Sequence, residues 1–188
     1  MKKLLLSILA ILLCASFADA QIISIAKKKA AGGGPDTYYY SEGLGEGDFS
    51  ANIELESGYM YAANVTVTTG GSLTKIGVKI SDKSSANIKI MLLKNSAADV
   101  HECAEIANAT LPSSGWYDYT LSTPLTVSNS EVVRVAIATS ASYTIRINYD
   151  GSDNGFTDTT HAYATACGSA PDGWGGYGKE LGVRVYVD

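Results

Sequence analysis

Alternation of apolar and polar residues with a period of two constrains the fold of this chain more than any other feature. In residues 63–68, an alanine and two valines alternate with polar side chains. Residues 76–80 and 88–92 repeat the pattern with isoleucine, valine or leucine at every second position. Because successive side chains of a β-strand point to opposite faces of a sheet, each segment is predicted to be a strand with one buried face.

Short polar turns separate these segments. Residues 69–72 and 82–85 carry glycine, serine or aspartate at hairpin spacing. Further strands are predicted at residues 103–109, 116–121, 131–139, 143–149 and 180–187. No segment of ten or more residues has apolar residues at helical spacing, and residues 97–107 are predicted to form no more than one turn of helix. The sequence therefore predicts an all-β fold, an antiparallel β-sandwich of the jelly-roll type.

The first twenty residues have the three parts of a secretory signal peptide. Two lysines follow the initiating methionine, an apolar run covers residues 4–13, and the small residues Ala18 and Ala20 precede the expected cleavage point. The run is about half of the ~20 residues that span a bilayer. The protein is therefore predicted to be secreted, with no membrane span, while lipid attachment at Cys14 stays open as an alternative.

Three parts of the chain are predicted: a signal peptide over residues 1–20, a flexible N-terminal arm over residues 21–36, and a β-sandwich domain over residues 37–188. The arm contains three lysines and three consecutive glycines, which bury no side chains. The 168 residues after the signal peptide have the size of one ordinary domain.

The charge of the chain argues against nucleic acid as a partner. The full sequence has 14 basic and 19 acidic side chains, and the part after the signal peptide has 12 and 18, a net charge of −6. Binding to a duplex depends largely on neutralising phosphates with lysine and arginine. A domain with a net negative charge would repel the phosphates instead of neutralising them.

Two cysteines, Cys103 and Cys167, remain after the signal peptide. An even number in an exported chain predicts that they form a disulfide, which would close a loop of about 65 residues and stabilise the fold by about 4 kcal/mol. Two buried free thiols are the alternative. A zinc site is not predicted, because the sequence has only two histidines and the cysteines are expected to pair.

Several segments of the chain, taken in order, resemble small jelly-roll modules of secreted bacterial proteins and of phage tail or virion proteins, which are similar to carbohydrate-binding modules. The segments that carry this resemblance are residues 71–80, 86–90, 115–121, 124–127, 170–178 and 181–187. The resemblance covers most of residues 55–188 and implies a jelly-roll fold and carbohydrate binding. Residues 129–136 lack the aromatic residues that this family commonly has in the corresponding strand.

A glycine-rich loop over residues 167–178 contains the predicted ligand-binding residues Trp174, Tyr177 and Asp172. A tryptophan among glycines is expected to be partly exposed, and exposed aromatic faces stack on sugar rings. The alternative is that Trp174 folds back over the end of the sandwich. Trp116, at the start of a strand, is predicted to be a core residue.

The tyrosines of residues 38–40, together with Tyr59 and Tyr61, are predicted to occupy half-buried structural positions.

Residues 150–155 place the oxygen-bearing side chains of Asp150, Ser152 and Asn154 at alternate positions before a glycine, as the start of a calcium loop does. A structural Ca²⁺ ion is one interpretation, and an ordinary polar hairpin turn is the other. The helix-loop-helix form of such a site would need a glutamate where His161 stands. No other cofactor is predicted.

No catalytic residues are predicted. Glu54 and Glu56 share one face of a strand, which is more typical of solvated acids than of a glycosidase pair. The first functional hypothesis is a non-catalytic module that binds a polysaccharide or a cell-surface glycan. The alternative is a structural subunit of an extracellular filament, surface layer or virion-like assembly, which would self-associate when residues 21–26 add a strand to a neighbouring sheet.

Overall fold

The computed structural model describes residues 37–41, 44–45, 48–94, 99–150, 160–163, 167, 175–176 and 179–188. These all belong to one unit, Gly34–Asp188. The predicted signal peptide and arm, residues 1–20 and 21–36, lie outside the described residues. Within the described residues, no helix is long and apolar enough to cross a bilayer.

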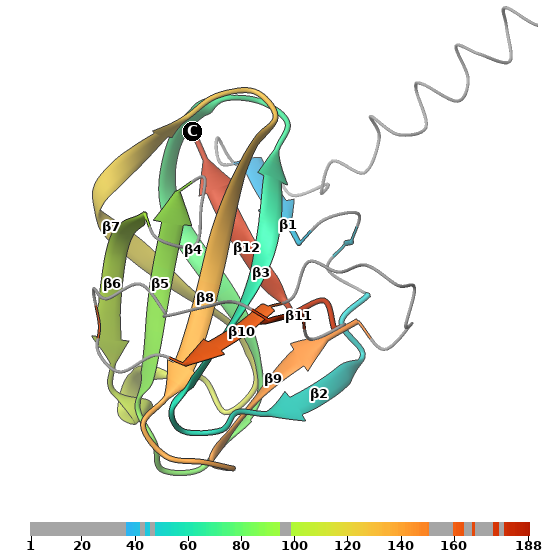
Figure 1. The fold of residues 1–188 in the computed structure, drawn as a ribbon, viewed down its shortest axis with the longest axis vertical. Helices are drawn as coiled ribbons and strands as arrows, with labels where there is room; N and C mark the ends of the chain where they lie inside the picture. The colour runs from blue at the N-terminus through green and yellow to red at the C-terminus, as the bar shows by residue number, and fades with distance from the viewer. Residues whose placement is uncertain are drawn as a thin grey trace, which may run out of the picture. The chain divides into compact units, whose positions relative to one another are not determined.

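The described residues form two antiparallel sheets (Figure 1). Sheet A consists of β1 (Thr37–Tyr40), β2 (Ala51–Glu54), β4 (Gly71–Lys83), β7 (Gly115–Val127), β9 (Ile145–Tyr149) and β12 (Val183–Val187). Sheet B consists of β3 (Tyr59–Val67), β5 (Ile88–Lys94), β6 (Val100–Ile106), β8 (Glu131–Thr139), β10 (Thr160–Tyr163) and β11 (Gly175–Gly176). One short 3₁₀ turn, η1 (Asn108–Thr110), follows β6. The predicted all-β sandwich is confirmed.

The strand β4 organises sheet A. The sheet order is β1-β12-β4-β9-β2, with β7 also paired to β4. Ile76 of β4 pairs with β12 and β7, whereas Ile80 pairs with β9 and β7. The strands β12 and β9 therefore follow each other along one edge of β4, and β7 occupies the other edge. The order in sheet B is β11-β10-β3-β8-β5-β6.

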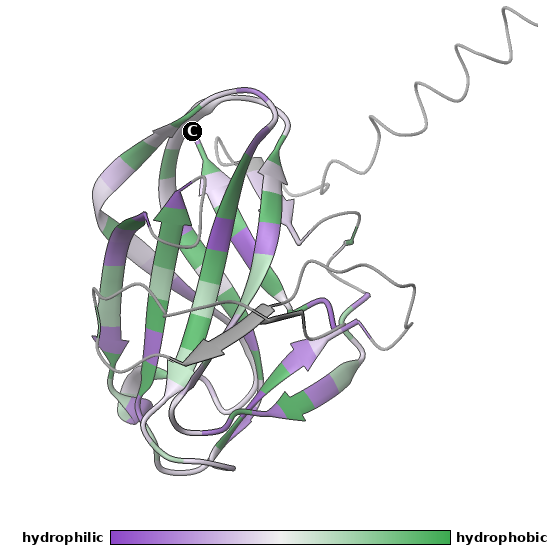
Figure 2. Cartoon of the chain, in the orientation of Figure 1, coloured by the Kyte–Doolittle hydropathy of each residue, from purple (hydrophilic) through white to green (hydrophobic). Residues whose placement is uncertain are grey.

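The core lies between the two sheets and is made by the alternation seen in the sequence. Val65, Ile90 and Val135 of sheet B and Val78 and Val185 of sheet A are all at most 1 % exposed and belong to one apolar cluster. Hydrophobic bands recur along β5 and β8 in Figure 2, separated by paler or hydrophilic ones. Burial of these alternate side chains, each stabilising the fold by about 1.5–3 kcal/mol, holds the sheets together.

The outer face of sheet B is also apolar over part of its area. Met60, Met91, Leu93 and Ala136 are fully buried in a second cluster on this face, packed against Cys103. Cys103 forms a disulfide with Cys167, with the two Cα atoms 5.5 Å apart, an ordinary disulfide separation. The predicted pairing is confirmed, and it fixes Cys167 to the outer face of sheet B.

The strand β7 leaves its ladder with β4 for a few residues. Leu125 pairs with Leu73 and Thr120 pairs with Lys75, so four residues of β7 lie opposite Thr74 alone. This irregularity lets Leu73 face the core together with Ile76 and Val78, although Leu73 lies an odd number of residues from both of them. It also removes residues 121–124 of β7 from the β4 ladder, and their backbone groups need other partners.

Glu102 of β6, in the other sheet, supplies those partners. Its carboxylate accepts hydrogen bonds from the backbone nitrogens of Ser122, at 2.9 and 3.0 Å, and Thr123, at 3.3 Å. It also accepts a 2.6 Å hydrogen bond from the hydroxyl of Tyr119. The neighbouring His101 donates from Nε2 to the carbonyl oxygen of Thr123 at 2.8 Å. Side chains of β6 thus link the edges of the two sheets.

Candidate functional site

The predicted ligand-binding residues Trp174, Tyr177 and Asp172 lie outside the described residues, so their role stays a prediction. The same holds for Ser152 and Asn154 of the predicted calcium loop. Asp150 is described and is 9 % exposed, directly after β9. Its backbone nitrogen donates to the carbonyl oxygen of Glu180 at 2.9 Å. Among the described residues, no three His, Cys, Asp or Glu side chains are grouped so as to hold a metal ion.

The prediction that Trp116 is a core residue is wrong. Trp116 is half-buried and lies on the outer face of sheet A, with Asp118. Its neighbours Tyr117 and Tyr119 pair with Val78 and Ile76 of β4, which face the core. Because directly paired residues point to the same face of a sheet, the tyrosines take the inner face and Trp116 the outer one.

Aromatic side chains from four separate segments meet on this outer face. We call the group Tyr38, Tyr40, Phe49, Trp116 and Tyr186 the aromatic face. Ring centroids lie 4.1 Å apart for Tyr38 and Tyr186, 5.7 Å for Tyr40 and Trp116, and 5.9 Å for Phe49 and Trp116. The two separations from Trp116 are ordinary for tilted and edge-to-face aromatic pairs, and Tyr38 and Tyr186 lie slightly closer than is usual.

The rings of the aromatic face differ in exposure. Phe49 and Tyr186 are only 3 % exposed and form its base, whereas Tyr38, Tyr40 and Trp116 remain partly open to solvent. The structural role predicted for Tyr39, Tyr59 and Tyr61 agrees with their packing in or against the core. Tyr38 and Tyr40, from the same predicted group, instead face outward with Trp116.

A charged pair lies in the middle of the aromatic face. Arg184 donates to both carboxylate oxygens of Asp118, from Nε at 3.0 Å and from Nη2 at 2.7 Å. Its guanidinium carbon also lies 4.2 Å from the ring centre of Trp116 and 5.3 Å from that of Tyr38. Planar guanidinium groups combine bidentate carboxylate binding with stacking on aromatic rings, and Arg184 does both here.

Hydrogen bonding joins the pair to the tyrosines. The hydroxyl of Tyr186 donates to Asp118 at 2.5 Å, and burial together with this bond raises the pKa of Tyr186. Burial opposes the charge of Arg184, but the hydrogen bond and charge of Asp118, with a contribution from Tyr40, raise the pKa of Arg184 overall. Both groups therefore keep their protons across the physiological pH range.

Two lysines flank this network on the same face. The ammonium of Lys75 lies 5.1 Å from the ring centre of Tyr186, and that of Lys79 lies 5.7 Å from Phe49 and 6.0 Å from Trp116. Gly77 stands between them on β4, where a Cβ atom would lie 2.3 Å from Asp118 Oδ1 and 3.0 Å from Arg184 Cγ. The absence of a side chain at Gly77 is what allows the charged pair to lie flat on the sheet.

Sequence reasoning missed the aromatic face, although each part was visible. Tyr38 and Tyr40, Trp116 and Asp118, and Arg184 and Tyr186 are three pairs at alternate positions, so each pair shares one face of its strand. Alternation does not say which strands are neighbours. The register of β1 on β12, β12 on β4 and β4 on β7 brings the three pairs together.

The sequence matches no protein-family model and no curated protein. Function has therefore to be inferred from the chemistry of the protein's own surface.

Proposed function

We propose that the protein is a secreted, non-catalytic module that binds extracellular or cell-surface carbohydrate, and that the aromatic face is its binding surface. One observation carries this proposal. The partly exposed rings of Tyr38, Tyr40 and Trp116 lie on one outward sheet face, around the charged pair Arg184–Asp118.

This combination suits a sugar. A pyranose ring has two faces of C–H groups, which stack on aromatic rings, and a rim of hydroxyls, which bond to charged side chains. Trp116 and Tyr40 supply ring surface, while Asp118 supplies acceptors and Arg184 donors.

The position of the aromatic face on the sheet also supports a binding role. Its residues come mostly from strands in a continuous hydrogen-bonded sheet, which holds them more rigidly than a loop would. The corresponding centre of the outer face of sheet B is fully buried at Met60, Met91 and Leu93. Of the two central outer surfaces, the one on sheet A is open to a ligand.

We also propose that the sandwich is a jelly roll. Eight strands, β1, β3, β4, β5, β6, β7, β8 and β12, change sheet at every step along the chain except from β5 to β6. Numbered in that order, sheet A contains the first, eighth, third and sixth strands, and sheet B the second, seventh, fourth and fifth. This interleaving, which two Greek keys produce, supports the jelly-roll interpretation. The disulfide, typical of oxidising compartments, supports export.

The chain has only two tryptophans, Trp116 and Trp174, which allows a direct test. Trp174→Phe leaves Trp116 as the only tryptophan, and Trp116→Phe leaves Trp174. Each variant, in the protein from residue 21 onward, is titrated with soluble β-glucan, xylan, mannan and alginate while tryptophan emission is recorded. We expect at least one polysaccharide to change the emission of Trp116 in the Trp174→Phe variant. Native affinity electrophoresis of the unmodified protein in the same polysaccharides provides an independent measure of binding.

The outcomes separate the two candidate sites. Emission that changes only in the Trp116→Phe variant would move the binding site to the loop of Trp174 and reject the aromatic face. If no polysaccharide retards the unmodified protein in electrophoresis and none changes the tryptophan emission of either variant, carbohydrate binding is rejected.

A further inference from the structure

Tyr143 is the most exposed of the large hydrophobic side chains that the structure describes. It lies in the connection between β8 and β9, residues 140–144, and is 66 % exposed. Its ring therefore contributes little to the core, whereas aromatic side chains usually bury a large part of their surface. Packing does not explain why a large aromatic residue occupies this position.

The backbone of Tyr143 makes the choice of residue still less favourable for folding. Its φ angle is +59°, in the left-handed region that glycine and asparagine adopt at low cost and other residues adopt under strain. Strain of this kind persists where the surrounding structure imposes it, and it is frequent at binding sites. Glycine or asparagine would form the same turn at lower cost, so the side chain of Tyr143 points to a role outside folding.

Hydrogen bonds from two neighbouring loops hold the turn in place. The backbone nitrogen of Tyr143 donates to the carbonyl oxygen of Leu55 at 2.9 Å, and that of Ser57 donates to Ser142 Oγ at 2.8 Å. On the other side, the nitrogen of Ser84 donates to the carbonyl oxygen of Thr144 at 2.8 Å. The loop is thus anchored from both sides, and Tyr143 is presented by a rigid support.

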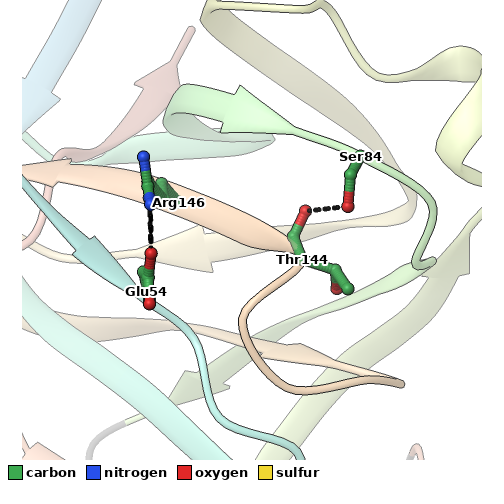
Figure 3. A network of polar contacts seen from close by, with 4 residues as sticks. All are labelled: Glu54, Ser84, Thr144 and Arg146. Carbon is green, nitrogen blue, oxygen red and sulfur yellow. Dashed lines mark hydrogen bonds and ion pairs between the residues drawn. The ribbon is translucent and has the colours of Figure 1, made fainter.

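Figure 3 shows one side of this support, where the hydroxyl of Ser84 donates to the carbonyl oxygen of Thr144 at 3.2 Å. Beside it, Arg146 donates from Nε to Glu54 at 2.8 Å and forms an ion pair between β9 and β2. This pair ties the first residues of β9, directly after the loop, to the edge of sheet A.

Serines are frequent in the loop of Tyr143 and in the loops bonded to it. Ser57, Ser84, Ser140 and Ser142 are all exposed and belong to the turn or to the two loops bonded to it. A rigid tyrosine among serines gives a large contact area at low entropic cost together with adaptable hydrogen bonding. The same pairing of ring and hydroxyls suits a polar molecule with an apolar face.

We propose that the loop of residues 140–144 is a second carbohydrate-binding site, separate from the aromatic face, in which the ring of Tyr143 stacks on a pyranose ring. This inference rests on the proposed function in one respect, the choice of carbohydrate as the ligand. A single protein molecule then contacts one polysaccharide chain at two places, or two chains at once, and binds a polymer more tightly than either site alone would.

The test uses substitutions that suit the left-handed backbone. Tyr143→Gly and Tyr143→Asn remove the ring and relieve the strain, so both proteins should unfold at a temperature no lower than that of the unmodified protein. Tyr143→Phe keeps the ring and serves as the matched control. Affinity electrophoresis in β-glucan, xylan, mannan and alginate measures binding. Loss of one stacked ring should weaken the affinity for the bound polysaccharide by about three- to tenfold.

Comparison with Tyr40→Ala, on the aromatic face, separates the two proposals. Weaker binding by Tyr143→Gly and Tyr143→Asn, with near-normal binding by Tyr143→Phe, supports the loop site whether or not Tyr40→Ala has an effect. Unchanged binding by both ring-deleting variants overturns the loop site, and an effect of Tyr40→Ala would then leave the aromatic face standing. An unmodified protein that binds none of the four polysaccharides overturns both.

Discussion

Replacement of Glu102 by glutamine should destabilise the protein more than the loss of one surface charge can explain. The carboxylate of Glu102 accepts hydrogen bonds from Ser122, Thr123 and Tyr119 where β7 leaves its ladder with β4. A glutamine keeps one acceptor oxygen but turns an NH₂ group toward the remaining donors. The substitution therefore leaves at least one of those donors facing another donor.

The magnitude follows from the exposure of the partners. A hydrogen bond to a charged group contributes about 1.5–3 kcal/mol when desolvated. Ser122 and Thr123 are exposed, so water replaces most of what their nitrogens lose. Tyr119 is half-buried, and its hydrogen bond to Glu102 raises its pKa to about 12. We expect Glu102→Gln to cost about 1–2 kcal/mol in total, or about 2–8 °C in the unfolding temperature of a domain this size.

The loss of stability caused by Glu102→Gln should depend on pH. Burial raises the pKa of Glu102, but the hydrogen bonds from Tyr119, Ser122 and Thr123 together lower it below its ordinary value of 4.5. A carboxyl whose pKa is lower in the folded state stabilises the fold above its unfolded-state pKa and loses this effect as the pH falls. The difference between the unmodified protein and Glu102→Gln should be complete at neutral pH and should shrink progressively below about pH 4.5.

Urea unfolding of both proteins at pH 7, 5, 4 and 3 measures this difference, and Glu105→Gln is the matched control. Glu105 lies on the same strand, is exposed, and accepts one side-chain hydrogen bond, from Asn87 Nδ2 at 3.2 Å. Its substitution should change stability by no more than about 0.5 kcal/mol. Equal effects of the two substitutions at pH 7, or an effect of Glu102→Gln that stays the same down to pH 3, would refute this account of the carboxylate.

Two further predictions concern the covalent and steric supports of the fold. Cys103→Ser combined with Cys167→Ser removes a bond between residues 64 apart and should lower the free energy of unfolding by about 4 kcal/mol in urea titrations, whereas an unchanged midpoint would show that the bond does not constrain the unfolded chain. Gly77→Ala should cost about 1–3 kcal/mol, because its Cβ atom would lie 2.3 Å from Asp118 Oδ1. Adding Asp118→Ala, which removes that oxygen, should make Gly77→Ala less costly than it is alone, and an undiminished cost would place the clash elsewhere.

The fold class could be predicted from the sequence because one face of most strands is buried and the other is solvated. Residues 76–80 and 88–92 lie within β4 and β5 as expected, and β3 covers residues 63–67 and ends one residue before Thr68. The strand predicted at residues 103–109 begins and ends earlier, as β6 at Val100–Ile106, because η1 follows at Asn108. The strand predicted at residues 116–121 continues to Val127 across its bulge.

Alternation failed where both faces of a strand are buried. In β5, Met91 and Leu93 face outward yet are fully buried, as are Met60 and Ala62 of β3. The period of two identified Ile88, Ile90 and Leu92 as the core-facing side of β5, but it did not predict that the opposite side is buried as well. The prediction for Trp116 was wrong for a related reason. Tryptophan is usually more buried than tyrosine, but the register with Val78 and Ile76, which local sequence does not contain, gave the inner face to the tyrosines.

The two outer faces of the sandwich have different consequences for binding. The apolar cluster on sheet B is fully buried at Met60, Met91 and Leu93, and the disulfide fixes Cys167 beside it. On sheet A, the charged pair Arg184–Asp118 and the partly exposed rings of Tyr40 and Trp116 take the equivalent central positions. A ligand that reached the sheet B cluster would have to displace buried apolar side chains from their contacts, at a cost of several kcal/mol. Contact with the aromatic face requires only that water leave partly exposed rings. The asymmetry of burial, more than the number of aromatic residues, is therefore our reason for proposing the binding surface on sheet A.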